Sequence, residues 1–250
     1  WFSSALWTWS TLVDQEKAAD YSLSLQEVLK ASVDYQTYHP TDVLESGRDI
    51  IFFWIARMIL ATTFMTGQIP FKRVYLHGMM RAEDGKKMSK SRPESIIDPL
   101  DMIEKYGTDA LRMAIIWGTT PGNDMSWSTP KIEATRNFAN KVWNMARYIE
   151  GVVGDLRVDF ETLKPQTSAD HWVLVKLQAI TNSTAKELEA LRFSEAFDAL
   201  YHFVWDDVAD WYIEASKSDQ NPTLLAYVLE SILKLLHPFA PFVTETIWQT

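Results

Sequence analysis

The most informative stretch of this 250-residue chain is Gly85-Lys86-Lys87-Met88-Ser89-Lys90-Ser91. It holds three lysines and two serines and no acidic residue, although the whole chain has a formal net charge of -9. A local excess of cations in an acidic chain indicates a site for an anion, most simply a phosphate. Lysine is a mobile point charge, serine hydroxyls add donors, and Gly85 lets the backbone turn. A solvated basic turn is the alternative interpretation.

The residues before this stretch predict part of an α/β nucleotide-binding fold. Residues 39–44 predict a short strand, residues 45–49 a turn, residues 50–63 an apolar helix, and residues 74–78 a buried strand that ends at glycine. Ligands of such sheets bind beyond the carboxyl ends of the strands, next to the turns that follow them.

The residues after Thr129 predict a different architecture. Amphipathic helices are expected at residues 129–153, 168–191, from Ser194, at 223–236 and from Phe242. We expect Thr129 and Ser168 to cap the first two, and Val175 and Trp211 to point into the bundle. The chain therefore predicts an α/β part over residues 1–127, the second half of a Rossmann-type fold, followed by an all-α helix bundle over residues 128–250.

Composition limits the classes of function. The acidic balance argues against a general nucleic-acid coat, so any RNA contact should be confined to local basic faces. The chain has no cysteine, and its histidines have no metal-ligand spacing, so we expect no structural metal. We find no signal peptide and no apolar run long enough to span a membrane, the longest being residues 50–55. A cytoplasmic protein without a membrane partner is expected.

Lys87-Met88-Ser89-Lys90-Ser91 is identical to the KMSKS signature of the class I aminoacyl-tRNA synthetases, and other stretches agree with it in order. These stretches are residues 1–7, 47–58, 77–78, 97–100, 107–112, 136–144, 210–212 and 237–242. Over nearly its whole length the chain resembles the class Ia branch, and within it the valyl-tRNA synthetases. An isoleucyl-type ligase, in which Asp is expected at the position of Ser3, is one alternative. A non-catalytic tRNA-binding module derived from a synthetase is another.

The resemblance implies ATP-dependent activation of valine to valyl-adenylate and transfer of the valyl group to tRNA(Val). It assigns Lys87 and Lys90 to catalysis, because their charge stabilises the triphosphate as pyrophosphate leaves. Met88, Ser89 and Ser91 are expected to complete this side of the ATP site. ATP is expected as its Mg²⁺ complex.

By the same resemblance, Gly47 and Asp49 line the ATP ribose, where a carboxylate accepts from hydroxyls. His77 and Gly78 are expected to lie against the adenine. The alternatives are that Asp49 is a helix N-cap and that His77 is a structural histidine.

Trp1 and Trp54 are expected to wall the valine pocket, although both could be ordinary core tryptophans. Trp211 and Tyr212 are expected in the core rather than under RNA bases. The helical half, residues 128–250, resembles the anticodon-binding domain of this group, in which the residues that could contact tRNA phosphates are Lys131, Arg136, Lys141 and Arg147. A solvated helix face is the alternative for these four cations.

The resemblance also implies that residues are missing. The HIGH motif of the family is absent, and the chain begins at Trp1 and ends within a helical pattern. We therefore expect a piece of a longer, monomeric enzyme, inactive by itself. After the signature the family often continues with Gly-Asn, whereas Arg92-Pro93 follows here, and Arg92 is expected to add a phosphate contact.

Overall fold

The computed structural model describes residues 2–89, 91–92, 96–156 and 158–250. The chain divides into two compact units. The first comprises Trp1–Met79 with Thr120–Met125, and the second comprises Met80–Thr119 with Ser126–Thr250. The lysine-rich stretch that opened the sequence analysis therefore belongs to the second unit, together with the helices.

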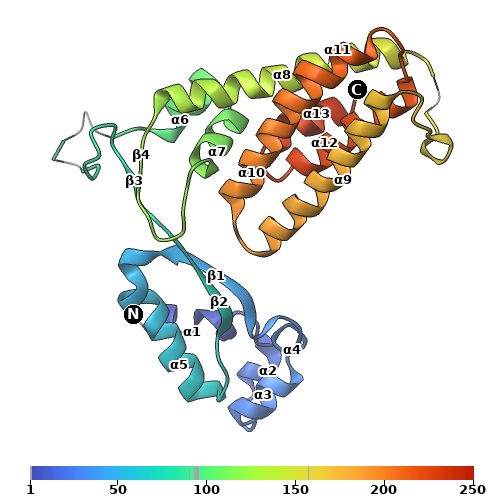
Figure 1. Ribbon diagram of the computed structural model, residues 1–250. Coiled ribbons are helices and arrows are strands. Elements are labelled where there is room, and N and C mark those ends of the chain that lie inside the picture. Colours follow the sequence, from blue (N-terminus) through green and yellow to red (C-terminus); the bar gives the residue numbers. More distant parts are fainter. Residues whose placement is uncertain (1, 90, 93–95, 157) are drawn as a thin grey trace. The chain divides into compact units, whose positions relative to one another are not determined.

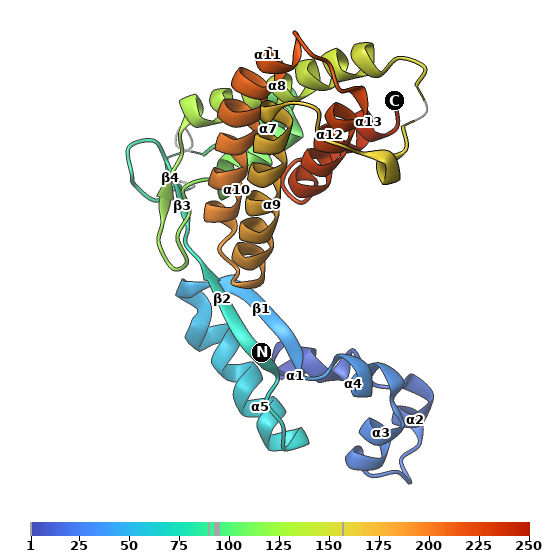
Figure 2. The same cartoon turned by 45° about the vertical axis from the view of Figure 1, so that its right-hand side comes forward.

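The first unit is built on a parallel pair of strands, β1 (Thr41–Gly47) and β2 (Phe71–His77). A 3₁₀ turn (Arg48–Ile50), a π-helical segment (Ile51–Ile55) and helix α5 (Ala56–Thr66) connect them. Figures 1 and 2 show α5 running beside both strands. The predicted strand–helix–strand order is confirmed, but β1 extends through the predicted turn because its ladder with β2 continues to the pair Gly47 and His77.

Helix α5 has one buried and one exposed face. Its buried face packs on α1 (Phe2–Ser10), where the hydroxyls of Thr8 and Thr62 lie 2.9 Å apart. Its exposed face carries Leu60 and Phe64. Three short helices precede β1: α2 (Gln15–Ala19), α3 (Leu25–Ala31) and α4 (Val33–Tyr38).

One helical segment among the described residues, Arg48–Thr66, is long and apolar enough to cross a membrane by those two criteria alone. Its mean hydropathy is 1.5, and 22% of the apolar window is buried. Core helices of soluble proteins can meet the same criteria. The expectation that no segment is long enough was wrong, because it counted only the uninterrupted run of residues 50–55, whereas the average over the helix tolerates Arg57.

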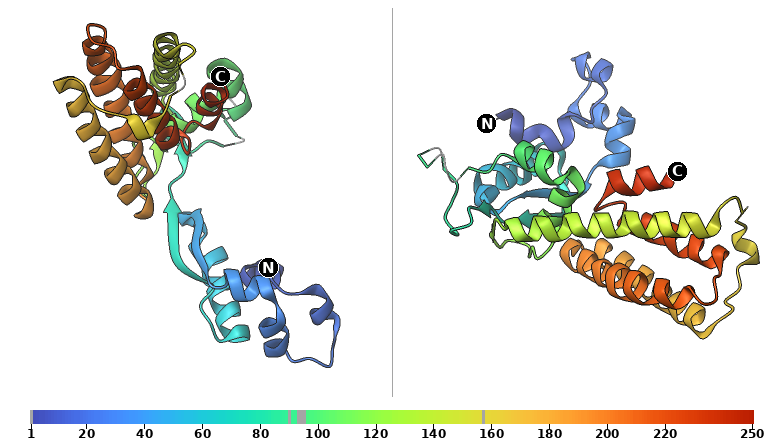
Figure 3. Two further views of the ribbon diagram at one scale, coloured as in Figure 1. Left: turned by 90° about the vertical axis from the view of Figure 1, so that its right-hand side faces the viewer. Right: turned by 90° about the horizontal axis from the view of Figure 1, so that it is seen from above.

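The second unit is helical. Its longer elements are α6 (Pro99–Tyr106), α7 (Thr108–Ile116), α8 (Thr129–Val153), α9 (Ser168–Glu189), α10 (Phe193–His202), a π-helical segment (Phe203–Tyr212), α11 (Ile213–Ser216), α12 (Pro222–Leu236) and α13 (Pro241–Trp248). A 3₁₀ turn spans Phe160–Thr162, and the short strands β3 (Met80–Arg81) and β4 (Met125–Ser126) pair with each other. Figure 3 shows α8 as the long yellow-green helix beside the orange helices. Apolar side chains from α8, α9, α10, the π-helical segment and α12 form one continuous core, as expected for a bundle.

Two helices begin one residue earlier than predicted. Ser128, not Thr129, is the N-cap of α8, and its hydroxyl accepts from the Lys131 amide. Thr167, not Ser168, caps α9 in a capping box with Asp170. Each site offers two adjacent residues that can cap, and the one with extended backbone takes the role. Helix α6 has Asp98 as its N-cap, whose carboxylate accepts from the Leu100 amide.

Two side chains expected in the bundle core are exposed. Val175 is 70% exposed because the buried face of α9 runs through Val173, Leu177 and Ile180, and a residue two positions from Val173 lies on the opposite face. Trp211 is 48% exposed, whereas Tyr212 is fully buried. The π-helical segment that contains both turns more slowly than an α-helix, so a position seven residues after Val204 leaves the buried face.

The start of α13 is held by a buried carboxylate from another helix. Asp109 of α7 accepts hydrogen bonds from the amides of Phe242 (3.3 Å) and Val243 (2.7 Å). Arg112, one turn further along α7, donates to the Pro238 carbonyl at 3.0 Å. Two stretches that carry the family resemblance, residues 107–112 and 237–242, are thus bonded to each other.

Candidate functional site

The carboxyl ends of β1 and β2 bring two predicted ATP residues together. Gly47 and His77 are register partners, and a methyl group on Gly47 would lie 3.4 Å from His77 Nε2. The imidazole Nδ1 of His77 bonds to the carboxylate of Glu45, a residue on the same strand as Gly47. The imidazole is therefore oriented from β1, at the edge where α/β sheets bind their ligands.

Gly78 has a steric reason to be glycine. A Cβ at this position would lie 1.7 Å from the carbonyl oxygen of Asn123, far inside van der Waals contact. Any larger residue would have to push residues 120–125 away from the end of β2. Packing against this segment is thus one role of Gly78, and its contact with adenine stays a prediction.

Asp49 lies inside the 3₁₀ turn that follows β1, with an exposed carboxylate. Gly47 occupies the N-cap position of that turn, so the alternative interpretation of Asp49 as an N-cap is wrong. The nearest described cation is Arg48, whose Nε lies 3.7 Å from the Asp49 carboxylate. The exposed carboxylate is free to accept from hydroxyl groups of a ligand.

Of the two tryptophans expected around an amino-acid pocket, only Trp54 falls among the described residues. It lies in the π-helical segment and packs, half-buried, against a cluster of Ile55, Met58 and Phe71. π-helical turns occur frequently at functional sites because they turn side chains out of the regular helical pattern. Trp1 lies outside the described residues, so its predicted role stays untested.

The lysine-rich stretch forms a tight hairpin in the second unit. The Ala82 amide donates to the Lys86 carbonyl at 2.9 Å, and Gly85 turns the chain with a φ of 74°. Lys87 pairs with Arg81 in an antiparallel bridge, and the Lys87 side chain remains exposed. The backbone is thus ordered while the cation is presented to solvent, as a phosphate ligand requires. Lys90 lies outside the described residues.

Arg92 closes this hairpin on itself. Its guanidinium donates to the Asp84 carboxylate at 3.1 Å and to the Lys87 carbonyl at 2.8 Å. The Lys86 amide bonds to the same carboxylate, and this bond, followed by the bond and charge of Arg92, holds the pKa of Asp84 below its usual value. The hydroxyls of Ser89 and Ser91 lie 2.8 Å apart. Asp84 thus engages Arg92 within the hairpin, and the expected contact of Arg92 with a phosphate stays a prediction.

The four cations expected to contact tRNA have different environments on α8. Lys131 turns inward and donates to the Trp117 carbonyl at 2.8 Å, and burial lowers its pKa. Lys141 is paired with Asp210 at 2.6 Å, over the face of Trp205. Arg136 and Arg147 are exposed. They are spaced by about three helical turns, so they lie on one face of α8.

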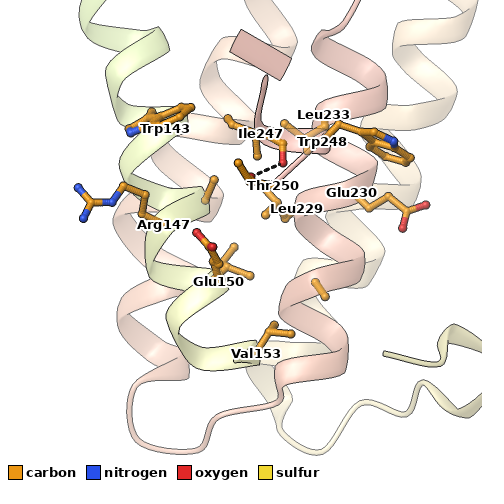
Figure 4. A pocket seen from close by; sticks show the side chains of 13 residues that line it. Trp143, Arg147, Glu150, Val153, Leu229, Glu230, Leu233, Ile247, Trp248 and Thr250 are labelled. Carbon is orange, nitrogen blue, oxygen red and sulfur yellow. Dashed lines mark hydrogen bonds between the residues drawn. The ribbon is translucent and has the colours of Figure 1, made fainter. Parts of the chain in front are cut away.

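An apolar hollow of about 410 Å³ lies between α8, α12 and α13. Trp143, Leu229 and Ile247 line it, and Figure 4 shows the guanidinium of Arg147 extending away from it. The other charged residues on its rim are Glu150 and Glu230, so the hollow has the wrong charge for a triphosphate. Within the described ranges, no cluster of three or more His, Asp or Glu is arranged to hold a metal ion.

Arg48 and Asp124, which were not predicted from the sequence, form a contact at the ends of β1 and β2. Arg48 donates to the Gly122 carbonyl at 2.6 Å and to the Asp124 carboxylate at 3.2 Å. Arg48 stands within the family stretch 47–58, between two residues assigned to ATP. That position is the signal that could have singled it out. Asp124 lies in a Gly-Asn-Asp turn with no such signal, because its partner is 76 residues away.

Comparison with known proteins identifies the class. Residues 1–128 match the family model of the class I tRNA synthetases (I, L, M and V), and residues 170–250 match that of the anticodon-binding domain of tRNA ligases. The first match covers more than half of the chain. The chain therefore belongs to the class I tRNA synthetase family.

Within this class, the similar curated proteins are valine–tRNA ligases. The valine–tRNA ligase of Geobacillus kaustophilus is 44% identical over 262 residues, which cover 100% of this chain and 28% of that protein. The valine–tRNA ligase of Staphylococcus epidermidis is also 44% identical, with the same coverage. The chain thus spans about 28% of the length of these relatives.

Solved structures support the fold. A leucyl enzyme of Agrobacterium radiobacter K84, in a ternary complex with tRNA and LeuAMS, superposes with a TM-score of 0.74 at 22% identity. That superposition covers 84% of this chain and 27% of the other. Mycobacterium tuberculosis methionyl-tRNA synthetase in complex with methionyl-adenylate gives a TM-score of 0.71 at 24% identity, over 88% of this chain and 46% of the other. The predicted fold class, a partial Rossmann-type fold followed by helices, is confirmed.

Proposed function

We propose that this chain is the part of a valine–tRNA ligase that holds the carboxy-terminal portion of the catalytic domain and the start of the anticodon-binding domain. The observation that carries the proposal is the 44% identity to valine–tRNA ligases along the entire chain. The complete KMSKS pentapeptide at residues 87–91 supports a catalytic rather than a merely binding role. No described feature favours the non-catalytic module.

The reaction is the attack of the valine carboxylate on the α-phosphate of ATP, which forms valyl-adenylate and releases pyrophosphate. Negative charge moves onto the leaving pyrophosphate, so catalysis needs oriented positive charge more than a general acid or base. Lys87, exposed on an ordered hairpin, and Lys90 supply that charge. Met88, Ser89 and Ser91 complete the phosphate side, and ATP binds as its Mg²⁺ complex.

The adenosine binds at the carboxyl ends of β1 and β2. Gly47 leaves room beside His77, and Asp49 accepts from the ribose hydroxyls. His77 and Gly78 face the adenine. Trp1 and Trp54 restrict the amino-acid pocket to a small branched side chain, since rigid aromatic walls exclude larger ones.

The helical part binds tRNA(Val). We infer domains at residues 1–127 and 128–250, and we place tRNA phosphates near Arg136 and Arg147, because these two cations are exposed on one face of α8. Lys131 and Lys141 contribute less, since a carbonyl and a carboxylate already engage them. The complete enzyme is a cytoplasmic monomer.

Charging of tRNA by the full-length protein tests this proposal. We expect valine to be attached to tRNA(Val), with no comparable transfer of isoleucine to tRNA(Ile). Charging of tRNA(Ile) with isoleucine would favour the isoleucyl-type alternative. Tight tRNA binding without any charging would favour the non-catalytic module.

A further inference from the structure

Arg48 connects three backbone segments at the end of the parallel strands. It directly follows Gly47, the last residue of β1, and donates to the Gly122 carbonyl and the Asp124 carboxylate. The second oxygen of that carboxylate accepts from the Met79 amide at 2.9 Å. One guanidinium thus links the end of β1, through Asp124, to the backbone just beyond β2.

Residues 120–125 take the place of a further strand along the end of β2. The Gly122 amide donates to the Leu76 carbonyl at 2.7 Å, and the Met125 amide donates to the Met79 carbonyl at 3.1 Å. Between these bonds, the Asn123 carbonyl lies against Gly78. The conformation of residues 77–79 is therefore set by this segment, and Arg48 fixes the segment from the β1 side.

We propose that Arg48 is a positioning residue for ATP, which holds the backbone of residues 77–79 in place by clamping residues 120–125 through Gly122 and Asp124. The proposal rests on the proposed function, because it takes the end of β2 as the adenosine site. The planar guanidinium suits the task, since it donates to two acceptors at once in fixed geometry. Lysine carries its donors on one flexible ammonium group, so it lacks the planar fork that fixes both acceptors.

A purely structural role would predict a different outcome. The Arg48 side chain is 42% exposed, and exposed ion pairs add little to the free energy of unfolding. Its loss should therefore leave the first unit folded while the end of β2 becomes less well positioned. Arg48 Nε also lies 3.7 Å from the carboxylate of Asp49, the proposed ribose ligand, so removal of Arg48 should weaken ATP binding at that residue as well.

The test uses ATP–pyrophosphate exchange by the full-length protein, with Arg48→Met, Arg48→Lys, Asp124→Asn and the double variant Arg48→Met/Asp124→Asn. Lys72→Met is the matched control. It breaks an exposed ion pair with Asp42 (2.7 Å) that joins the same two strands at their opposite end.

For Arg48→Met we expect the KM for ATP to rise about tenfold, the scale of a lost charge-assisted hydrogen bond, with the KM for valine and the melting temperature nearly unchanged. Arg48→Lys should recover part of the loss. Asp124→Asn should raise the same KM, and the rise in the double variant should be smaller than the two single effects combined, because the two residues share the Arg48–Asp124 contact. The control should match the unmutated protein.

An unchanged KM for ATP in Arg48→Met, an equal rise in the Lys72→Met control, or additive effects in the double variant would overturn the positioning role. The unmutated protein tests the proposed function separately, by whether its exchange depends on valine. ATP affinity measured by calorimetry on the same proteins decides the role of Arg48 even without exchange.

Discussion

Lys87 shows how a residue can be exposed and yet ordered. Its backbone pairs with Arg81, and its carbonyl accepts from Arg92, so the hairpin fixes where the side chain starts. The ammonium group itself remains in solvent. An exposed cation of this kind costs the fold little and is available to the triphosphate of the proposed reaction.

We therefore predict that Lys87→Ala combined with Lys90→Ala lowers the rate of valyl-adenylate formation by roughly a hundredfold or more, the scale of removing an oriented charge stabiliser. The thermal midpoint should change little, because the Lys87 side chain is exposed. Single-turnover formation of adenylate by the full-length protein measures the rate. Lys217→Ala is the control, since Lys217 pairs only with its helical neighbour Glu214 in the described structure. A double variant with the unmutated rate would refute the assigned role.

At this scale the sequence identifies residues whose role follows from their chemistry and order. Gly47 and His77 are assigned to one site in this way, and the strand register brings them together, whereas the roles of the KMSKS lysines stay predictions. The contact between Arg92 and Asp84 is not found in this way, because the two residues become partners only once the hairpin folds. Arg48 is missed for a related reason, since its acceptors are 74 and 76 residues away.

At the scale of elements, Asp109 explains why α13 needs no cap of its own. Proline opens that helix, no side chain at its own N-cap position bonds to it, and the Asp109 carboxylate accepts from the amides of Phe242 and Val243. Asp109 is itself buried. Helix starts leave amides without partners, and a carboxylate there also interacts favourably with the helix dipole.

We predict that Asp109→Asn lowers the free energy of unfolding by about 2 kcal/mol, because the amide side chain can accept one of these bonds but not both. Urea unfolding measures the change. Asp101→Asn, an exposed change in the first turn of α6, should stay within about 0.5 kcal/mol of the unmutated protein. Equal effects of the two changes would contradict the capping role.

Asp170 joins three elements in the same way. Tyr212 donates to one of its oxygens at 2.9 Å, and Asn221 donates to the other at 3.0 Å. Burial favours the neutral acid, but bonds from the Gln166 amide, Asn221, Tyr212 and the Thr167 amide outweigh it and hold the pKa of Asp170 below 3.8. Burial and the same bond raise the pKa of Tyr212.

These shifts predict opposite pH dependences. A carboxyl whose pKa is lowered by folding stabilises the folded state at pH values above its pKa in the unfolded chain. The difference in free energy of unfolding between the unmutated protein and Asp170→Asn should therefore shrink as pH falls below about 4. A tyrosine whose pKa is raised by folding stabilises the folded state at pH values below its pKa in the unfolded chain. The difference in free energy of unfolding between the unmutated protein and Tyr212→Phe should therefore shrink as pH rises above about 10. Urea midpoints across the pH range measure both. An advantage over Asp170→Asn that persists in acid would contradict the network.

Element types were predictable from periodicity, and their details were not. The strand–helix–strand order and the helices of the bundle follow from apolar spacing and from Pro and Gly breaks. The exposure of Trp211 depends on the π-helical segment. No local sequence pattern predicts this segment, because tertiary packing selects it. The choice between Ser128 and Thr129 as a cap depends on backbone conformation alone.

At the scale of the whole molecule, the net charge is negative, whereas the KMSKS hairpin is locally positive. A net charge of -9 disfavours general RNA binding, so the proposed contacts with tRNA are confined to a few exposed cations such as Arg136 and Arg147. The family matches divide the chain in a similar way, with residues 1–128 in the synthetase model and residues 170–250 in the anticodon-binding model. Two family models therefore match one chain, with the KMSKS hairpin inside the first match.

On the proposed function, the choice of valine would depend on side chains around the pocket rather than on the fold. Solved leucyl and methionyl enzymes superpose on this chain, so the architecture alone does not select the amino acid. Trp54 is held half-buried in the π-helical segment, where its size limits the space next to it. Specificity should therefore appear in the activation step, before any tRNA binds.

Amino-acid-dependent ATP–pyrophosphate exchange by the full-length protein tests the proposed activation of valine, because it reports adenylate formation without tRNA. We expect the highest kcat/KM with valine and a value for isoleucine lower by at least about tenfold, since an additional methylene must enter a pocket built for a smaller side chain. Exchange that is strongest with isoleucine, or no exchange with either amino acid, would contradict it.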